Sequence, residues 1–127
     1  MKPEIELHRV YDHAGVAPGR YRVLVDRLWP RGVRREDLAY DAWPKDLAPS
    51  PELRRWFGHR PERWAEFHER YAAELKGDAQ RQGLSALLRD AGSRPIALLY
   101  GAKDPDHNHA LVLRDALLRT ARHSHSS

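Results

Sequence analysis

The fold of this chain is decided by two apolar stretches, residues 21–29 (YRVLVDRLW) and residues 96–100 (IALLY). Their β-branched and leucine centres are typical of strands that are buried on both faces. Near the start of the chain, Ile5, Leu7 and Tyr11 fall on alternating positions, which predicts a third, half-buried strand. The predicted strands therefore lie toward the two ends of the chain.

Helix signals fill the space between these strands. Ser50 and Pro51 predict a helix start, with the serine as N-cap and the proline at the first helical position, and Gly58 predicts its end. Apolar residues at three- and four-residue steps predict three further helices, over residues 61–75, 78–91 and 108–121.

Strands at both ends with helices between them require crossover connections. The sequence therefore predicts a single-domain α/β fold with a small, mainly parallel sheet covered by helices. We expect this domain to span residues 1–122 and residues 123–127 to form a disordered tail. Residues 33–49 are predicted to be irregular, with one short helical turn near Glu36 and an extended piece over residues 40–43.

Composition limits the class of protein. The chain has 127 residues, of which 41% are hydrophobic and 31% charged, as expected for one soluble domain. The absence of cysteine excludes thiol nucleophiles, thiolate metal sites and disulfides. Residues 1–8 hold two glutamates and no apolar run of signal-peptide length, and no run is long enough to span a membrane. We therefore expect a cytoplasmic protein without membrane contact.

Several cofactor and catalytic motifs are missing. The sequence has no glycine-rich phosphate loop of the dinucleotide or Walker kind, so we predict no nucleotide cofactor. His107 and His109 have no third ligand at a recognised spacing, so we predict no metal. Ser50 has a local capping role and no nucleophile-elbow motif around it, so we do not expect it to be a nucleophile.

Candidate site residues follow the two apolar strands. In parallel sheets ligands bind beyond the carboxyl ends of the strands, so residues 26–32 and 101–109 share one rim if these strands are parallel neighbours. Asp26, which the pattern places in the middle of a strand, is either a structural pair partner or a general base. His109, one position into the last helix, is the best titrating candidate. We expect these two residues to carry any proton transfer.

Cationic side chains follow the same strands. Residues 29–32 (WPRG) form a rigid turn that aims Arg31 from a strand end, where it is suited, with Arg27, to hold a phosphate or carboxylate. Lys103 and Asn108 lie in the second loop, just before a helix whose N-terminus favours an anion. Asn108 is alternatively the N-cap of that helix.

The sequence contains four characteristic blocks, residues 22–32, 47–57, 66–75 and 98–113. Together they resemble the domain of unknown function 488 (DUF488) family, in its YeaO-like branch. The resemblance implies a small bacterial or archaeal cytosolic α/β protein and no particular activity. Its signature segments include Trp43-Pro44-Lys45, which adds Lys45 to the candidate ligand residues. Some members of another branch carry cysteines in the loop that matches residues 100–109, so a thiol or metal activity is not implied for this chain.

Three functions are compatible with these features. The leading hypothesis is a site for a small anionic, phosphate-bearing or nucleotide-like ligand, in a hydrolase or transferase if the ligand is turned over. The second is a nucleic-acid-binding or regulatory module that uses the arginines of residues 20–35 and 54–63. The third is a protein-interaction domain, monomeric or homodimeric, whose four tryptophans partly face a partner or a second copy.

Overall fold

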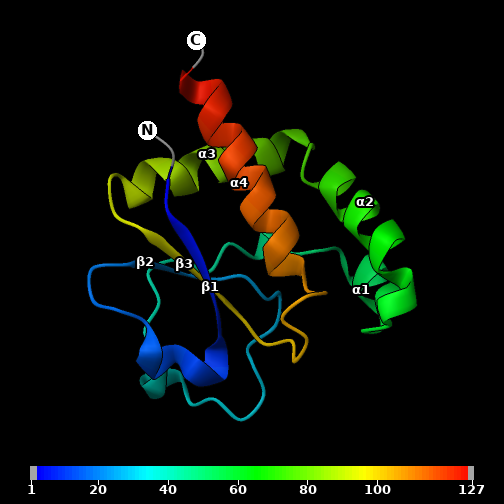
Figure 1. Cartoon of the computed structure of the whole chain (residues 1–127), viewed down its shortest axis with the longest axis horizontal. Coiled ribbons are helices and arrows are strands. Elements are labelled where there is room, and N and C mark those ends of the chain that lie inside the picture. Colours follow the sequence, from blue (N-terminus) through cyan, green and yellow to red (C-terminus); the bar gives the residue numbers. More distant parts are fainter. Residues whose placement is uncertain (1–2, 126–127) are drawn as a thin grey trace.

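The described residues of this protein form a sheet of three parallel strands. The computed structural model describes residues 3–125, with side chains described up to residue 122. The strands are β1 (Ile5–Arg9), β2 (Tyr21–Leu24) and β3 (Ile96–Tyr100). Their order is β1-β3-β2, so the last strand lies between the two earlier ones (Figure 1). All five residues of β3 are buried, as its continuous apolar sequence predicts.

β2 is shorter than its apolar sequence suggests. It ends at Leu24, although the backbone N–H of Val25 still donates to the backbone oxygen of Leu99 at 3.0 Å. The prediction that Asp26 lies in the middle of a buried strand is therefore wrong, because Asp26 lies in the loop that follows β2. Beyond Val25 the side chains bond to other loops. Asp26 accepts a hydrogen bond from the loop after β3, and Arg27 donates to the backbone oxygen of Pro49.

In the described part of the chain four α-helices connect and follow the strands: α1 (Pro51–Phe57), α2 (Trp64–Glu74), α3 (Asp78–Ala91) and α4 (His109–His125). The predicted start and end of α1 are confirmed. The Ser50 hydroxyl accepts a hydrogen bond from Leu53 N at 3.2 Å, and Gly58 has a left-handed backbone with a φ of 52°. α4 includes residues 123–125 of the predicted tail, and residues 126 and 127 lie outside the described residues.

Short 3-10 helices occupy the connections: η1 (Val10–Gly15), η2 (Arg35–Asp37), η3 (Lys45–Leu47) and η4 (Pro61–Arg63). η2 confirms the helical turn predicted near Glu36. Ala42 forms an isolated parallel bridge with Val23, which confirms the extended piece predicted for residues 40–43.

The two faces of the sheet are covered differently. On one face, Val23 and Leu98 pack against buried residues of all four α-helices. On the other face, Leu24 and Leu99 pack against η1 and the loop over residues 29–43. The α-helices therefore cover one face of the sheet, and an irregular segment rich in large apolar side chains covers the other.

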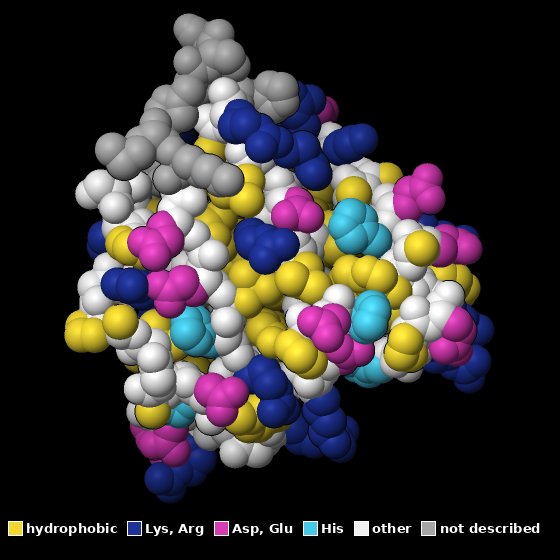
Figure 2. Space-filling view, in the orientation of Figure 1, with side chains coloured by type: hydrophobic (Ala, Val, Ile, Leu, Met, Phe, Trp, Pro, Cys, Tyr) yellow, Lys and Arg dark blue, Asp and Glu magenta, His cyan; other side chains and the backbone are white. Residues whose placement is uncertain are grey.

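The surface carries charges of both signs. Figure 2 shows Lys and Arg beside Asp and Glu, with hydrophobic side chains exposed between them. The large hydrophobic residues with the most exposed surface are Tyr11, Leu28 and Tyr40. Among residues 3–125, no helix has the length and apolar character needed to cross a lipid bilayer.

Candidate functional site

The loops that follow β2 and β3 meet at the carboxyl edge of the sheet. β2 and β3 are parallel neighbours, which confirms the adjacency on which the predicted rim depends. The backbone N–H of Gly101, directly after β3, donates to Asp26 Oδ2 at 3.0 Å. A Cβ atom at position 101 would lie 2.6 Å from that oxygen, so this close approach requires glycine.

Asp26 also faces His109 at the start of α4. Asp26 Oδ1 and His109 Nε2 are 2.8 Å apart, and the two side chains are 20% and 17% exposed. The two atoms are buried at ion-pair distance but lack the alignment of a hydrogen bond, and neither has another hydrogen-bond partner within residues 3–125. Trp43 Nε1 donates to the backbone oxygen of Asp26 at 2.7 Å and fixes the chain there. The two residues predicted for proton transfer are therefore neighbours.

Asn108 caps α4. Its Oδ1 accepts a hydrogen bond from Ala110 N at 3.0 Å, and its Nδ2 donates to the backbone oxygen of Asp104 at 2.9 Å. Hydrogen bonds from the backbone N–H of Asp106 and then from the His107 side chain lower the pKa of the Asp104 carboxyl. These bonds order the loop before α4 and occupy both polar atoms of the Asn108 amide.

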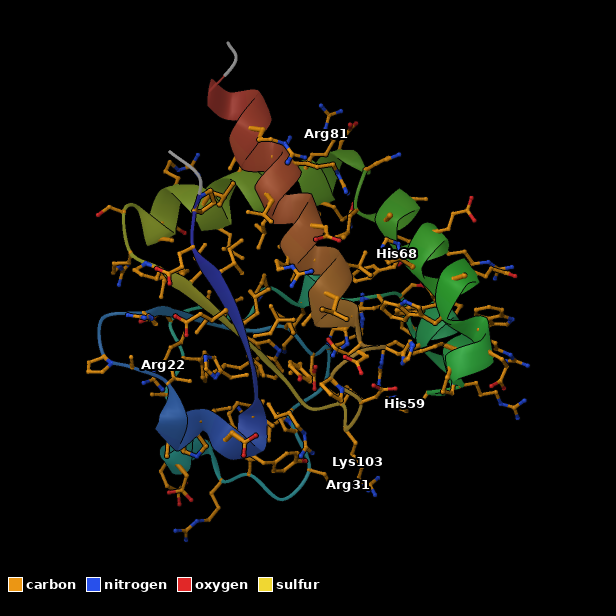
Figure 3. All side chains as sticks on the ribbon, viewed as in Figure 1. Arg22, Arg31, His59, His68, Arg81 and Lys103 are labelled. Atoms are coloured by element: carbon orange, nitrogen blue, oxygen red, sulfur yellow. The ribbon has the colours of Figure 1, made fainter. Side chains whose placement is uncertain are left out.

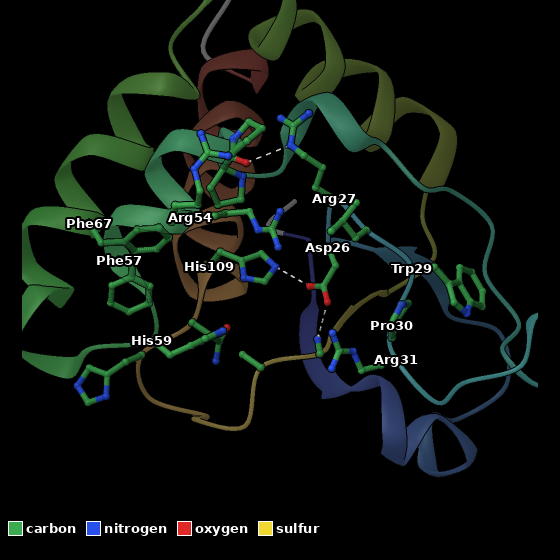
Figure 4. A pocket seen from close by; sticks show the side chains of 18 of the residues that line it. Asp26, Arg27, Trp29, Pro30, Arg31, Arg54, Phe57, His59, Phe67 and His109 are labelled. Carbon is green, nitrogen blue, oxygen red and sulfur yellow. Dashed lines mark hydrogen bonds and ion pairs between the residues drawn. The ribbon is translucent and has the colours of Figure 1, made fainter.

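A cavity of about 530 Å³ opens between these two loops and α1. This volume is in the usual range of small-molecule sites, about 300–1,000 Å³. The described residues that line it include one carboxylate, that of Asp26, and four arginines, Arg27, Arg31, Arg54 and Arg55. In Figure 4, Arg54 and Arg31 lie on opposite sides of the Asp26–His109 pair.

The four guanidinium groups differ in their partners. Arg27 Nε donates to the backbone oxygen of Pro49 at 3.2 Å, which holds this side chain at the cavity wall. Arg31, Arg54 and Arg55 are exposed, and their side chains have no hydrogen bond or ion pair with the part of the chain that the structure describes. Unpaired guanidinium groups beside a cavity are suited to bidentate binding of phosphate or carboxylate.

Two predicted ligand residues lie outside this cavity. Lys45 Nζ lies 4.1 Å from the centroid of the Trp43 ring, and neither of these residues lines the cavity, although Trp43 packs on Trp29, which does. Lys103 is exposed on the loop after β3 and does not line the cavity (Figure 3). Of the predicted ligand cations, Arg27 and Arg31 line it.

The contribution of α1 was missed by sequence reasoning. Leu53 and Phe57 are buried, so the helical period turns Arg54 and Arg55 outward, but it does not say what lies opposite them. From the sequence, these arginines are predicted only as part of a nucleic-acid-binding surface. His59, which also lines the cavity, has a φ of 57°, uncommon for a residue other than glycine. The sequence carries no signal for this conformation.

The fold and the cavity define a small α/β protein with a parallel three-stranded sheet and an arginine-lined pocket at its carboxyl edge. Residues 4–127 match the model of the family described as the inactive DUF488-N3 subclade, and the chain belongs to this family. The match confirms the resemblance to DUF488 that the four sequence blocks indicate.

The relatives that support this assignment come from bacteria. The chain is 49% identical to the uncharacterized protein YeaO of Escherichia coli (strain K12) over 114 residues, which cover 89% of this chain and 96% of YeaO. It is 39% identical over 113 residues to the uncharacterized proteins Mb3100c of Mycobacterium bovis and Rv3073c of Mycobacterium tuberculosis, covering 89% of this chain and 92% of each relative. No solved structure has significant similarity to the chain.

Proposed function

We propose that this protein binds a small phosphate-bearing anion in the cavity at the carboxyl edge of its sheet. The observation that carries the proposal is the set of three guanidinium groups without a protein partner among the described residues, those of Arg31, Arg54 and Arg55. Hydrogen bonds to charged groups contribute about 1.5–3 kcal/mol each. Two or three such contacts at one cavity are sufficient to hold a small anion.

The loop that carries Arg31 is already ordered. The Tyr11 hydroxyl donates to the backbone oxygen of Arg31 at 2.8 Å, and Gly32 has a φ of 79°, which a residue with a side chain rarely adopts. Arg54 and Arg55 lie on a helix with a defined N-cap. Because both elements are fixed before the ligand arrives, binding costs little loop-ordering entropy.

Asp26 and His109 supply the other charges of this site. The family description as inactive favours binding over turnover, so we propose that the pair balances charge rather than catalyses a reaction. The imidazole of His109 lies 2.8 Å from the carboxylate of Asp26, which would otherwise face the anion and repel it.

A nucleic-acid surface has weaker support, because several arginines of residues 20–35 have partners inside the protein. Arg20 Nε donates to Glu6 Oε2 at 2.7 Å, and Arg34 Nε donates to Asp37 Oδ2 at 3.0 Å. Cations that are already paired release fewer counterions on binding a phosphate backbone. These residues therefore favour a small ligand over a duplex.

The test is a thermal-unfolding screen against phosphate, sulfate and organic phosphates, followed by titration calorimetry. A ligand at a hundred times its Kd adds about 2.7 kcal/mol to the free energy of unfolding, which is readily measured in a domain of this size. We expect Arg31→Ala and Arg54→Ala each to weaken phosphate binding about 10- to 100-fold, the equivalent of one charged hydrogen bond.

Arg81→Ala is the matched control, because Arg81 is exposed on α3 and does not line the cavity (Figure 3). It should leave the affinity unchanged. The proposal is wrong if no phosphate or sulfate compound binds, or if the control weakens binding as much as the cavity variants. A shift with a short DNA duplex that falls steeply with salt, and none with small anions, would favour the nucleic-acid alternative.

A further inference from the structure

The cavity is much larger than the anion that its arginines would hold. Its volume of about 530 Å³ equals that of roughly 18 water molecules at about 30 Å³ each, whereas inorganic phosphate has five heavy atoms. A ligand that fills the site therefore carries a body several times larger than its phosphate group. The rest of the lining indicates the chemistry of that body.

The hydroxyl and carboxamide groups of the described lining are already used. The hydroxyl of Tyr11 donates to the backbone oxygen of Arg31, and the amide of Asn108 bonds the backbone at both of its polar atoms. The indole N–H of Trp29 donates to the backbone oxygen of Val33. A polyhydroxylated body, such as that of a sugar phosphate, would find no free hydroxyl or carboxamide partner here, and its side-chain partners would be limited to Asp26, the histidines and the arginines that hold the phosphate.

Apolar and aromatic groups make up much of the remaining wall. Leu28 is 62% exposed and lines the cavity, so its side chain offers apolar surface to a ligand. In Figure 4, Phe57 and His59 lie on one side of the Asp26–His109 pair. Guanidinium groups add to this environment, since their planes stack on aromatic rings as well as pair with phosphate.

We infer that the ligand of this cavity is a phosphate joined to a planar aromatic body, rather than inorganic phosphate or a sugar phosphate. The inference rests on the proposed function, since the arginines hold the phosphate. The ring system covers the exposed side chain of Leu28 and lies against the other apolar side chains of the lining.

Calorimetric titration with 1-naphthyl phosphate, glucose 6-phosphate and inorganic phosphate tests this inference, because the three carry the same anionic group. We expect 1-naphthyl phosphate to bind at least tenfold more tightly than glucose 6-phosphate. Leu28→Ser should weaken naphthyl phosphate binding several-fold and leave the affinity for inorganic phosphate unchanged. Leu111→Ser, at a partly exposed leucine of α4 that does not line the cavity, is the matched control and should change neither.

The possible results distinguish failure of this inference alone from failure of the proposed function. Equal affinities for the two organic phosphates would overturn the aromatic body and leave the anion site in place. Absence of binding by all three phosphates would overturn both. If 1-naphthol binds as tightly as its phosphate and Arg31→Ala has no effect, the cavity is an apolar site, and the proposed function is wrong together with the inference.

Discussion

Gly101→Ala tests the contact that joins the two loops of the site. The new Cβ atom would lie 2.6 Å from Asp26 Oδ2, and ordinary contact begins near 3.4 Å, so the carboxylate must withdraw by about 0.8 Å. That movement breaks the 3.0 Å hydrogen bond from the backbone N–H of residue 101 and disturbs the contact between the carboxylate and His109.

The energetic terms have opposite signs. Loss of a hydrogen bond to a charged acceptor costs about 1.5–3 kcal/mol. Replacement of glycine by alanine returns about 0.4–1 kcal/mol, because the unfolded chain loses conformational freedom. We therefore expect Gly101→Ala to lower the free energy of unfolding by a net of about 0.5–2.5 kcal/mol.

Urea unfolding followed by tryptophan fluorescence measures this change, since the chain contains four tryptophans. Gly15→Ala is the matched control, because no atom lies within 4 Å of its added Cβ and its φ is not positive. The control should be neutral or slightly stabilising. In an Asp26→Ala background the obstructing oxygen is gone, so Gly101→Ala should there cost nothing. Equal costs in the two backgrounds would refute the reasoning.

Two further predictions concern the rest of the fold. Tyr71→Phe removes the buried hydrogen bond from the phenol to the backbone oxygen of Leu47. We expect the free energy of unfolding, measured in urea, to fall by about 1–3 kcal/mol. An unchanged free energy would contradict a stabilising role for that bond. Hydrogen bonds from His8 and then Arg20 lower the pKa of Glu6 below its ordinary value of 4.5. The ionised form of Glu6 is therefore favoured in the folded state and adds less than about 1 kcal/mol to the free energy of unfolding. This contribution is complete above pH 4.5 and is lost as the pH falls through the lower pKa of the folded state. The free energies of unfolding of the wild type and Glu6→Gln should converge below the folded pKa of Glu6. A difference that stays constant with pH would argue against the pairing of Glu6 with His8 and Arg20.

Local signals in the sequence determined the elements of this fold. The Ser50 hydroxyl and the left-handed backbone of Gly58 bound α1 where the sequence predicts, because capping and positive φ depend on adjacent residues. The apolar run of β3 required burial on both faces, and it became the central strand of a parallel sheet. The carboxyl ends of neighbouring parallel strands meet at one edge of a sheet, so the sequence also predicted that residues 26–32 and 101–109 lie on one rim. The pairing of β2 with β3 and the hydrogen bond from Gly101 to Asp26 confirm this.

Only the tertiary structure decided which side chains line the cavity. The period of α1 shows that Arg54 points away from the core, but the loop that faces it comes from a distant part of the sequence. Lys45 resembles a ligand residue in sequence, yet it packs on an indole outside the cavity, and the amide of Asn108 is consumed by its own helix cap. The period of the apolar residues shows which side of a helix or strand is buried, because residues at that spacing lie on one face of the element. What stands opposite the exposed side depends on contacts between segments far apart in the chain, and these form only when the whole domain packs.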